Sequence, residues 1–380
     1  MKILINALGA DVGGGANHLI NFVQELNQME SKNEYWFLCR EKFSHLDTKS
    51  RIKFILKPSA FGQNPFVRIF FDNFSLPKMI ASGDFDVLVS LTNFGPIKTK
   101  VPHIIFQTNA IYFSSWYRKL ITGKRKIETS FRAELTHRIM LNAAVVVTPS
   151  NSMRAMIQET FPDLKYSDFQ TLYHGFTKPT HSEVLGAETQ RALNIPQHKI
   201  VYPSLAALHK GISLVFETVR ELQTVWSDQF KIFLTFSERE AIEAYDKKTL
   251  PPDWENLCKS IVFLGKLPHS QMSSLYEACD LMFYPSLCES FGFSMIEAIG
   301  IGLPIVASKT PINQEICQNS ALYFPIDSPR IAAENIKSVL SDSKLRAELL
   351  FEGQARFNSF DWSWRRYCAE FERILCNSLS

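Results

Sequence analysis

The sequence predicts an α/β fold made of two Rossmann-like domains that face a central cleft. Three observations support this prediction: a chain of 380 residues, an ordinary globular composition with 46% hydrophobic residues, and short apolar runs that alternate with helical patterns in two series. A chain of this length exceeds what one hydrophobic core usually serves, so two domains are expected. Strands that alternate with helices form a parallel sheet flanked by those helices.

The first series of apolar runs lies in the N-terminal part of the chain, where a helical pattern covers about residues 17–29. We place the first domain at residues 1–178 and expect a C-terminal helix, residues 361–380, to join it. The apolar runs, read as strands, are residues 2–8, 35–39, 87–90, 104–106 and 145–148.

A second series begins near residue 199. Between the two series, residues 177–197 contain Pro179, Gly186 and Pro196 among polar residues and show little apolar periodicity, as is typical of an interdomain connection. We predict a linker at residues 179–198 and a second domain at residues 199–360. This domain has apolar runs at 199–203, 230–236, 261–264, 281–284 and 304–307 and helical patterns at 212–224, 270–278 and from about 294.

Charge and cysteine content exclude several classes of protein. Lys and Arg total 41 against 38 Asp and Glu, so we expect no nucleic-acid partner. The seven cysteines are scattered without a Cys-x-x-Cys pair, and His137 and His174 have no metal-like spacing, which argues against a disulfide framework and a zinc site. We found neither a signal peptide nor a membrane span. A cytoplasmic protein is expected.

Two glutamates flank a predicted strand-to-helix turn. Glu289 lies in the loop after the apolar run at residues 281–284, and Glu297 lies about one turn into the next helix. In an open parallel sheet, ligands bind at the carboxyl ends of the strands. A carboxylate on each side can accept hydrogen bonds from hydroxyls of a sugar and of a ribose. A solvated helix face is the alternative that the spacing alone would favour.

The turn between the glutamates is suited to bind a diphosphate. The free N–H groups of residues 291–294 and the helix dipole together attract an anion at the helix N-terminus. Gly292 allows the backbone to come close to the ligand. The segment therefore predicts a phosphate site with a carboxylate at each end.

This region resembles the donor-site signature of glycosyltransferase family 4, two-domain retaining enzymes with the GT-B architecture. The resemblance rests on residues 278–307, where Glu289 and Glu297 bracket Ser-Phe-Gly-Phe before a glycine helix stop and a buried strand. It implies transfer of a sugar from a nucleotide-diphosphate donor to a glycan or lipid-linked acceptor, without a metal or other cofactor, in the synthesis of bacterial cell-surface polysaccharide or lipopolysaccharide. Further matches are Gly13-Gly14-Gly15, Thr148-Pro-Ser-Asn-Ser152, Leu172-Tyr-His-Gly175 and His209-Lys210-Gly211.

The resemblance also implies roles for individual residues. Glu297 is expected to bind the ribose hydroxyls and Glu289 to act on the donor sugar. Main-chain groups supply the remaining donor contacts: Gly292, Phe293 and Ser294 to the diphosphate, and Gly265 and Leu267 of the segment 263–267 to the base.

A diphosphate also needs cationic partners. The resemblance gives this catalytic role to Lys210. Five residues earlier, where many family members carry arginine, the chain has Leu205, and the loss of that cation lowers the expected stabilisation of the transition state. His209 is a candidate to compensate, and a helix-capping or solvated histidine is the alternative.

The glycine run of the first domain is a second candidate anion site. Such a run lets backbone N–H groups approach an anion, and Asn17 or a neighbour is expected to open the helix. We assign Gly14, Gly15 and Asn17 to the leaving diphosphate or the acceptor, with a flexible turn as the alternative. His18 stands where a G-x-G-x-x-G fingerprint would have its last glycine, which argues against a nicotinamide dehydrogenase.

Two further polar segments of the first domain contain residues that could bind a ligand or a metal. Relatives often carry histidine at the strand end where this chain has Gln107, Thr108 and Asn109; Asn109 is a candidate to orient an acceptor or donor hydroxyl, and a strand-end cap is an equal alternative. Asp84-Phe-Asp86 imitates an Asp-x-Asp metal motif but directly precedes an apolar run, where a turn aspartate is a sufficient explanation. We expect no metal site.

Residues 113–127 combine aromatic side chains with five cations. This mixture suits an anionic membrane surface and predicts docking of the first domain near a lipid-linked acceptor, at the inner face of the plasma membrane. A solvated basic loop with its aromatic residues packed inward is the alternative.

Two other functions stay open. Nucleotide-sugar epimerases share the architecture, and incubating the donor alone would reveal an epimer. A non-catalytic sugar-nucleotide-binding partner subunit is compatible with Leu205 and with the missing histidine, and donor hydrolysis without an acceptor would argue against it.

Overall fold

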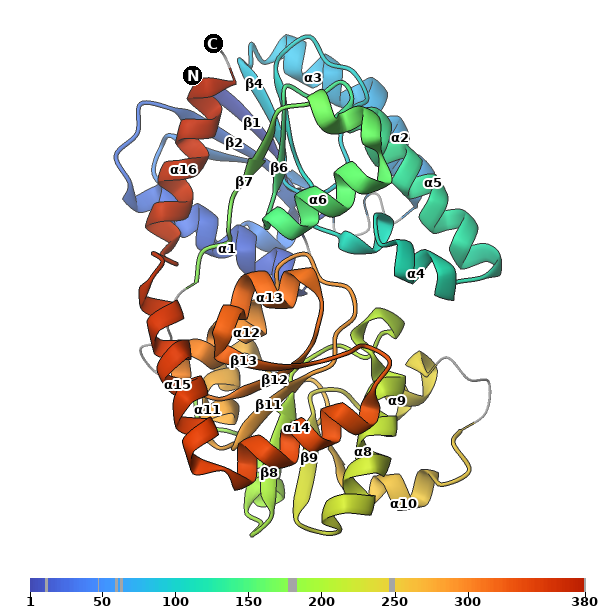
Figure 1. Ribbon diagram of the computed structural model, residues 1–380. Coiled ribbons are helices and arrows are strands. Elements are labelled where there is room, and N and C mark those ends of the chain that lie inside the picture. Colours follow the sequence, from blue (N-terminus) through green and yellow to red (C-terminus); the bar gives the residue numbers. More distant parts are fainter. Residues whose placement is uncertain are drawn as a thin grey trace. The chain divides into compact units, whose positions relative to one another are not determined.

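The structure, a computed structural model, describes residues 1–10, 13–46, 48–58, 61, 64–176, 183–245 and 250–378. The chain forms two compact units: Met1–Gly175 with Trp362–Ser380, and Phe176–Asp361. Each unit contains one parallel sheet with helices packed on it (Figure 1). The predicted class, an α/β fold of two Rossmann-like domains, is confirmed.

The sheet of the first unit has seven parallel strands in the order β3-β2-β1-β4-β5-β6-β7. The order reverses between β1 and β4, and ligands of open α/β sheets bind at such a switch point. The strands are β1 (Lys2–Asn6), β2 (Glu34–Arg40), β3 (Ile52–Lys57), β4 (Val87–Ser90), β5 (His103–Phe106), β6 (Val145–Thr148) and β7 (Phe169–Thr171).

Helices pack on both faces of this sheet because its strands are apolar on both sides. Ile3 and Ile5 of β1 belong to the core cluster that contains residues of α1 and α16, whereas Leu4 belongs to the cluster beneath α3. The helices are α1 (Gly13–Gln28), α2 (Pro65–Phe70), the π-helix η2 (Phe71–Ser75), α3 (Leu76–Ser82), α4 (Ser115–Leu120), α5 (Gly123–Met140), α6 (Asn151–Thr160) and α16 (Trp364–Asn377), with 3₁₀ turns η1 (Glu41–Phe43), η3 (Ala110–Tyr112) and η4 (Pro162–Tyr166).

The sheet of the second unit has six parallel strands in the order β10-β9-β8-β11-β12-β13, which reverses between β8 and β11. These strands are β8 (His198–Tyr202), β9 (Phe230–Leu234), β10 (Ile261–Phe263), β11 (Leu281–Tyr284), β12 (Ile305–Ser308) and β13 (Ala321–Phe324). Its helices are α7 (Ala187–Leu193), α8 (Ile212–Trp226), α9 (Glu238–Ala244), α10 (Trp254–Cys258), α11 (Met272–Glu277), α12 (Phe293–Ile301), α13 (Pro311–Cys317), α14 (Pro329–Ser341) and α15 (Ser343–Asn358), with 3₁₀ turns η5 (Leu208–Lys210), η6 (His269–Gln271) and η7 (Gln318–Ser320).

The segment predicted as a linker is partly folded. Helix α7 lies inside it and groups with the second unit, and the side chains of Leu185 and Leu193 are buried. Two buried leucines are enough to dock a short helix although they give little periodicity in the sequence. Residues 177–182, at the start of the predicted linker, lie outside the described residues.

Helix α1 also begins earlier than expected. It starts at Gly13, so Gly14, Gly15 and Asn17 lie inside the first turns of the helix and not in a turn before it. Asn17 therefore does not open the helix, and its carbonyl oxygen accepts a hydrogen bond of 2.8 Å from the Asn21 side chain. Glycine is a poor helix former, and packing of the buried α1 residues Leu19 and Phe22 outweighs that preference.

Candidate functional site

Two loops of the second unit meet at the carboxyl ends of β8 and β11, where the strand order reverses. The backbone N–H of Leu287 donates to the carbonyl of His209 at 2.9 Å. Gly211 has a φ of +70°, and a Cβ added there would lie 2.3 Å from the carbonyl oxygen of Pro285. Only glycine fits this contact, so the sequence His209-Lys210-Gly211 fixes the first loop against the second.

Glu289 and Lys210 form an ion pair at this junction. The Lys210 Nζ lies 2.5 Å from Glu289 Oε1, and the two side chains are 20% and 10% exposed. Ser286 Oγ and Tyr284 OH donate to the same oxygen at 2.6 and 2.8 Å. Burial would raise the pKa of Glu289, but the charge of Lys210 and these hydrogen bonds outweigh it and hold the pKa below its ordinary value. The carboxylate is therefore ionised at neutral pH.

Glu297 lies one turn into α12, where the sequence analysis placed it, and its side chain is buried. Both carboxylate oxygens have partners: His269 Nε2 lies 2.9 Å from Oε1, and Tyr276 OH donates to Oε2 at 2.9 Å. The hydrogen bond to Glu297 raises the pKa of His269 above its ordinary value, against the effect of burial. His269 therefore places a titratable cation beside the predicted ribose-binding carboxylate.

The N-terminus of α12 separates the two glutamates. Gly292 caps the helix with a φ of +89°, and a Cβ there would lie 2.4 Å from the Met295 side chain. Phe293 and Ser294 form the first turn of the helix, the end at which the helix dipole favours an anion. A glycine with positive φ therefore precedes the N-terminus of α12, as expected for the predicted diphosphate site. Binding of a diphosphate there stays a prediction.

The remaining predicted donor residues have clear positions. Burial, followed by the nearby charge of Lys210, lowers the pKa of His209 to about 4, so this histidine is neutral at neutral pH and does not replace the cation that is missing at Leu205. The Leu205 side chain is exposed. Gly265, with a φ of +69°, and Leu267 follow the edge strand β10.

The candidates in the first unit are held by local structure. The Asn109 side chain accepts a hydrogen bond of 3.2 Å from the Ile111 N–H and caps η3, which is the alternative that the sequence left open. Asp86 Oδ2 accepts from the N–H of Lys2 at 2.7 Å, and Asp84 sits in a turn with a φ of +49°, so both aspartates have structural roles. Among the described residues, no group of three or more His, Cys, Asp or Glu could hold a metal ion.

Four site residues were not predicted from the sequence: Tyr284, Ser286, Tyr276 and His269. Tyr284 is the last residue of an apolar strand, where the sequence pattern indicates only burial. Tyr276 and His269 precede β11 and meet Glu297 through the packing of η6 and α11 beside α12. A polar side chain at or just after the carboxyl end of a strand is a signal that could have indicated Tyr284 and Ser286. The positions of Tyr276 and His269 before β11 carry no such signal.

The sequence of the second unit matches a known family model. Residues 188–355, which form most of this unit, fit the model described as glycosyl transferases group 1. This segment is a glycosyl transferases group 1 domain. The predicted recognition is thus confirmed at the level of group 1, and membership of family 4 stays a prediction.

Curated relatives of the glycosyltransferase domain include enzymes of O-antigen synthesis. The chain is 27% identical to the O-antigen chain mannosyltransferase RfbU of Salmonella typhimurium over 36% of this chain and 35% of that protein. It is 32% identical to O-antigen chain mannosyltransferase B of Escherichia coli over 27% of each protein, and 30% identical to the O-antigen biosynthesis glycosyltransferase WclY of Escherichia coli over 37% of each. The matches span only about a third of the length of these relatives.

Solved structures share the fold of the whole chain. Sucrose-phosphate synthase from Thermosynechococcus elongatus has a TM-score of 0.76 at 15% identity, covering 99% of this chain and 98% of that one. HepE of Anabaena in complex with UDP has a TM-score of 0.69 at 15% identity, covering 99% of this chain and 100% of that one. WaaG, a glycosyltransferase involved in lipopolysaccharide biosynthesis, has a TM-score of 0.65 at 14% identity, covering 95% of this chain and 96% of that one. At these identities the likeness shows the GT-B fold alone.

Proposed function

We propose that the chain is a retaining, metal-independent glycosyltransferase that moves a sugar from a nucleotide-diphosphate donor to a glycan or lipid-linked acceptor. One observation carries the proposal: a partly buried Lys210–Glu289 ion pair lies where the loops after β8 and β11 meet. The family match of residues 188–355 supports it. The O-antigen relatives support a role in bacterial cell-surface polysaccharide or lipopolysaccharide synthesis.

The proposed donor site uses the second unit alone. Glu297 would accept hydrogen bonds from the ribose, and the N–H groups at the start of α12 would bind the diphosphate. The ammonium of Lys210 has three N–H donors, of which Glu289 takes one. The other two N–H donors of Lys210 can stabilise the negative charge that develops on the leaving nucleoside diphosphate. Because the chain has Leu205 where many family members have arginine, Lys210 would supply more of this stabilisation.

The proposed reaction needs no basic side chain from the first unit. In retaining transfer by front-face attack, an oxygen of the donor phosphate takes the proton of the acceptor hydroxyl. Glu289 would hold the donor sugar so that its anomeric carbon faces that hydroxyl, and correct orientation accounts for much of the rate. Turnover that persists in EDTA would support the metal-independent reaction, and loss of turnover that added Mg²⁺ or Mn²⁺ restores would contradict it.

A thermal-shift screen with UDP-, GDP-, dTDP- and ADP-sugars tests the proposed donor site. A donor present at about 100 times its dissociation constant should stabilise the protein by about 2.7 kcal/mol. We expect Glu297→Ala to abolish the shift, because the ribose loses its carboxylate acceptor. A donor shift that Glu297→Ala leaves intact would refute the site assignment. Analysis of the donor after incubation without acceptor distinguishes hydrolysis, which supports a transferase, from epimer formation.

We also propose that the first unit docks on an anionic membrane surface. Within residues 113–127, Phe113 and Tyr117 are buried, whereas Lys124, Arg125 and Lys126 are exposed at the start of α5. Phe113 and Tyr117 therefore pack inward, as the alternative interpretation expected of the aromatic residues, whereas the cations at the start of α5 and the neighbouring Ile127 are exposed. A bilayer-spanning helix, long and apolar throughout, does not occur in the part of the chain that the structure describes.

Exposed apolar side chains lie on α5, α2 and η2 of the first unit. Ile127 and Phe131 of α5 are exposed beside the cations, and Phe66, Phe70 and Phe74 are exposed on α2 and η2. Phe70 and Phe74 stack with ring centroids 4.8 Å apart. Exposed apolar patches of this kind are rare on soluble monomers and often mark interaction sites.

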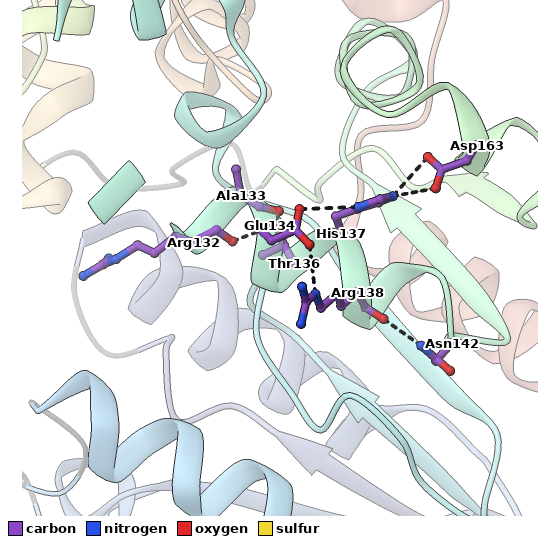
Figure 2. A network of polar contacts seen from close by, with 8 residues as sticks. All are labelled: Arg132, Ala133, Glu134, Thr136, His137, Arg138, Asn142 and Asp163. Carbon is purple, nitrogen blue, oxygen red and sulfur yellow. Dashed lines mark hydrogen bonds and ion pairs between the residues drawn. The ribbon is translucent and has the colours of Figure 1, made fainter. Parts of the chain in front are cut away.

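Helix α5 is fixed at the end opposite to these cations (Figure 2). His137 Nε2 lies 3.0 and 2.9 Å from the two carboxylate oxygens of Asp163 in η4, and its ring stacks on Phe161 at 4.2 Å. Glu134 accepts from Arg138 Nε at 2.8 Å on the same helix. His137 is thus a structural residue, and the basic start of α5 projects from a helix that is held in place.

Flotation with vesicles that contain phosphatidylglycerol tests the docking. Replacing Lys124, Arg125 and Lys126 by Glu should release the protein from the vesicles, because each cation contributes about 1 kcal/mol near such a surface. A matched control reverses three exposed cations of the second unit, Arg239, Arg330 and Lys344, with the same change in net charge. Equal flotation of the two variants would contradict the proposal.

A further inference from the structure

The carboxylate of Glu289 is held from one side. Three donors converge on its Oε1: Lys210 Nζ at 2.5 Å, Ser286 Oγ at 2.6 Å and Tyr284 OH at 2.8 Å. Across the described residues, every hydrogen bond to this carboxylate ends on Oε1. An ionised carboxylate offers about four acceptor positions over its two oxygens, so Oε1 is saturated and the acceptor capacity of Oε2 remains.

We propose that Tyr284 and Ser286 are positioning residues that hold Glu289 through Oε1 and so present Oε2 as the acceptor for a hydroxyl of the transferred sugar. The inference rests on the proposed glycosyltransferase function and adds two residues to it. Neither side chain needs to touch the substrate. Their effect on the reaction passes through the orientation of the carboxylate.

Tyr284 is a rigid donor. It ends β11, its side chain is buried, and its ring packs edge-on against Tyr202 with centroids 5.9 Å apart. The Tyr202 hydroxyl in turn donates to the carbonyl of Lys210 at 2.7 Å. The two tyrosines therefore hold the lysine and the glutamate in one arrangement. Burial raises the pKa of Tyr284 well above its ordinary value, which keeps its proton available for the hydrogen bond.

Ser286 is fixed through its backbone. Its carbonyl oxygen accepts a hydrogen bond from the hydroxyl of Ser308, at the end of β12. The Asn313 side chain donates to both the carbonyl and the hydroxyl oxygen of Ser308 at 2.9 Å. The position of the Ser286 hydroxyl is thus set by β12 and α13, outside the loop that carries Glu289.

A donor set of one ammonium and two hydroxyls does more than neutralise the carboxylate. Lys210 alone would leave the carboxylate free to turn about its last side-chain bond, because an ammonium attracts either oxygen. Two neutral hydroxyls in fixed positions remove that freedom without adding charge. The remaining oxygen is then preorganised for a hydroxyl, which is how buried polar groups favour one reacting geometry.

Isosteric substitutions test the role of each hydroxyl. Tyr284→Phe and Ser286→Ala should each lower kcat about 10-fold or more, the loss expected for a hydrogen bond to a charged group. The affinity for UDP or GDP, whichever stabilises the wild type, should be unchanged, because the sugar is absent from these probes. The acid limb of the pH–rate profile should move to higher pH, because the ionised form of Glu289 loses a donor. Tyr35→Phe, which removes a hydroxyl bonded to the carboxylate of Glu372 in the first unit, is the matched control and should behave as the wild type.

A double-mutant cycle identifies the route of the effect. If Tyr284 acts through Glu289, adding Tyr284→Phe to Glu289→Gln should cause no further loss of kcat. A further 10-fold loss in that background overturns the inference, and so does a Tyr284→Phe enzyme whose kcat and pH profile match those of the wild type. A parallel loss at every pH indicates a merely structural tyrosine and also overturns it. Failure of the wild type to bind or turn over any of the UDP-, GDP-, dTDP- and ADP-sugars would instead contradict the proposed function.

Discussion

At the residue scale, the contact between Lys210 and Glu289 is the central feature of the predicted donor site. Glu289 was predicted from its place after an apolar strand together with the family resemblance, and Lys210 was predicted from the resemblance alone. The contact between Lys210 and Glu289 was not predicted. The structure brings Lys210 onto the carboxylate at 2.5 Å, so the lysine supports the glutamate as well as the predicted phosphate.

Removing this lysine should impair both functions. We expect Lys210→Met to lower kcat about 100-fold or more, because an electrostatic contact to the leaving group is lost from a largely buried site. The pKa of Glu289 should rise, since the charge of Lys210 opposes the effect of burial, and the acid limb of the pH–rate profile should move upward. Steady-state kinetics across pH measure both effects.

A matched lysine provides the control. Lys259 is exposed between α10 and β10, and Lys259→Met removes the same charge from the surface of the same unit. We expect near wild-type kinetics, as is usual for exposed residues. Equal losses in the two variants would mean that the charge of the unit matters and the Lys210–Glu289 contact does not.

At the scale of elements, helix α1 illustrates how packing overrides local preference. Three successive glycines predict a turn, yet the helix starts at the first of them. Its His18 ring packs edge-on against Trp364 and Tyr367 of α16 and against His174 after β7, with centroids 4.7 to 5.1 Å apart. The C-terminal helix supplies half of this cluster, and no local pattern in residues 13–28 could indicate it.

The His18 cluster predicts acid sensitivity of the first unit. Burial lowers the pKa of His18 to about 3 from an ordinary value of 6.5. Between these values the unfolded chain binds the proton and the folded chain does not, so stability falls as pH decreases from 6.5 towards 3. Below 6.5 this histidine alone should give a slope of about 1.4 kcal/mol per pH unit.

Urea unfolding at pH 7 and pH 5 measures the slope. We expect His18→Phe to flatten it, because phenylalanine keeps the ring contacts and has no titratable nitrogen. The exposed His45 gives the control His45→Phe, which should leave the slope unchanged. A slope that His18→Phe does not alter would assign the acid sensitivity to other groups.

At the scale of the whole molecule, each unit is built on its own sheet, and the predicted donor residues other than Gly14 and Gly15 lie within Phe176–Asp361. Helix α16, the last element of the chain, belongs to the first unit. Its Phe371 is fully buried and packs edge-on against Phe22 of α1 at 4.9 Å. The first unit therefore needs both ends of the chain, while the second is contiguous.

This division predicts separable effects on stability and binding. Phe371→Ala should destabilise the first unit by about 3 to 5 kcal/mol, the cost of a cavity in a packed core, and denaturant unfolding measures it. Titration with UDP or GDP at a temperature where the variant is folded should give the wild-type dissociation constant. Weakened nucleotide binding in the folded variant would contradict a donor site made by the second unit alone.

The sequence by itself determined the α/β class, the two series of strands and helices, and the residue types of the donor site, because these depend on local periodicity and on glycines and charges at strand ends. Tertiary structure decided the rest. The edge strands β3, β7 and β13 and the helix α7 depend on pairing and packing with distant elements. The donors around Glu289 and Glu297 come from separate segments, and only the packing of β8, β11 and α11 brings Lys210, Tyr284 and Tyr276 to those carboxylates.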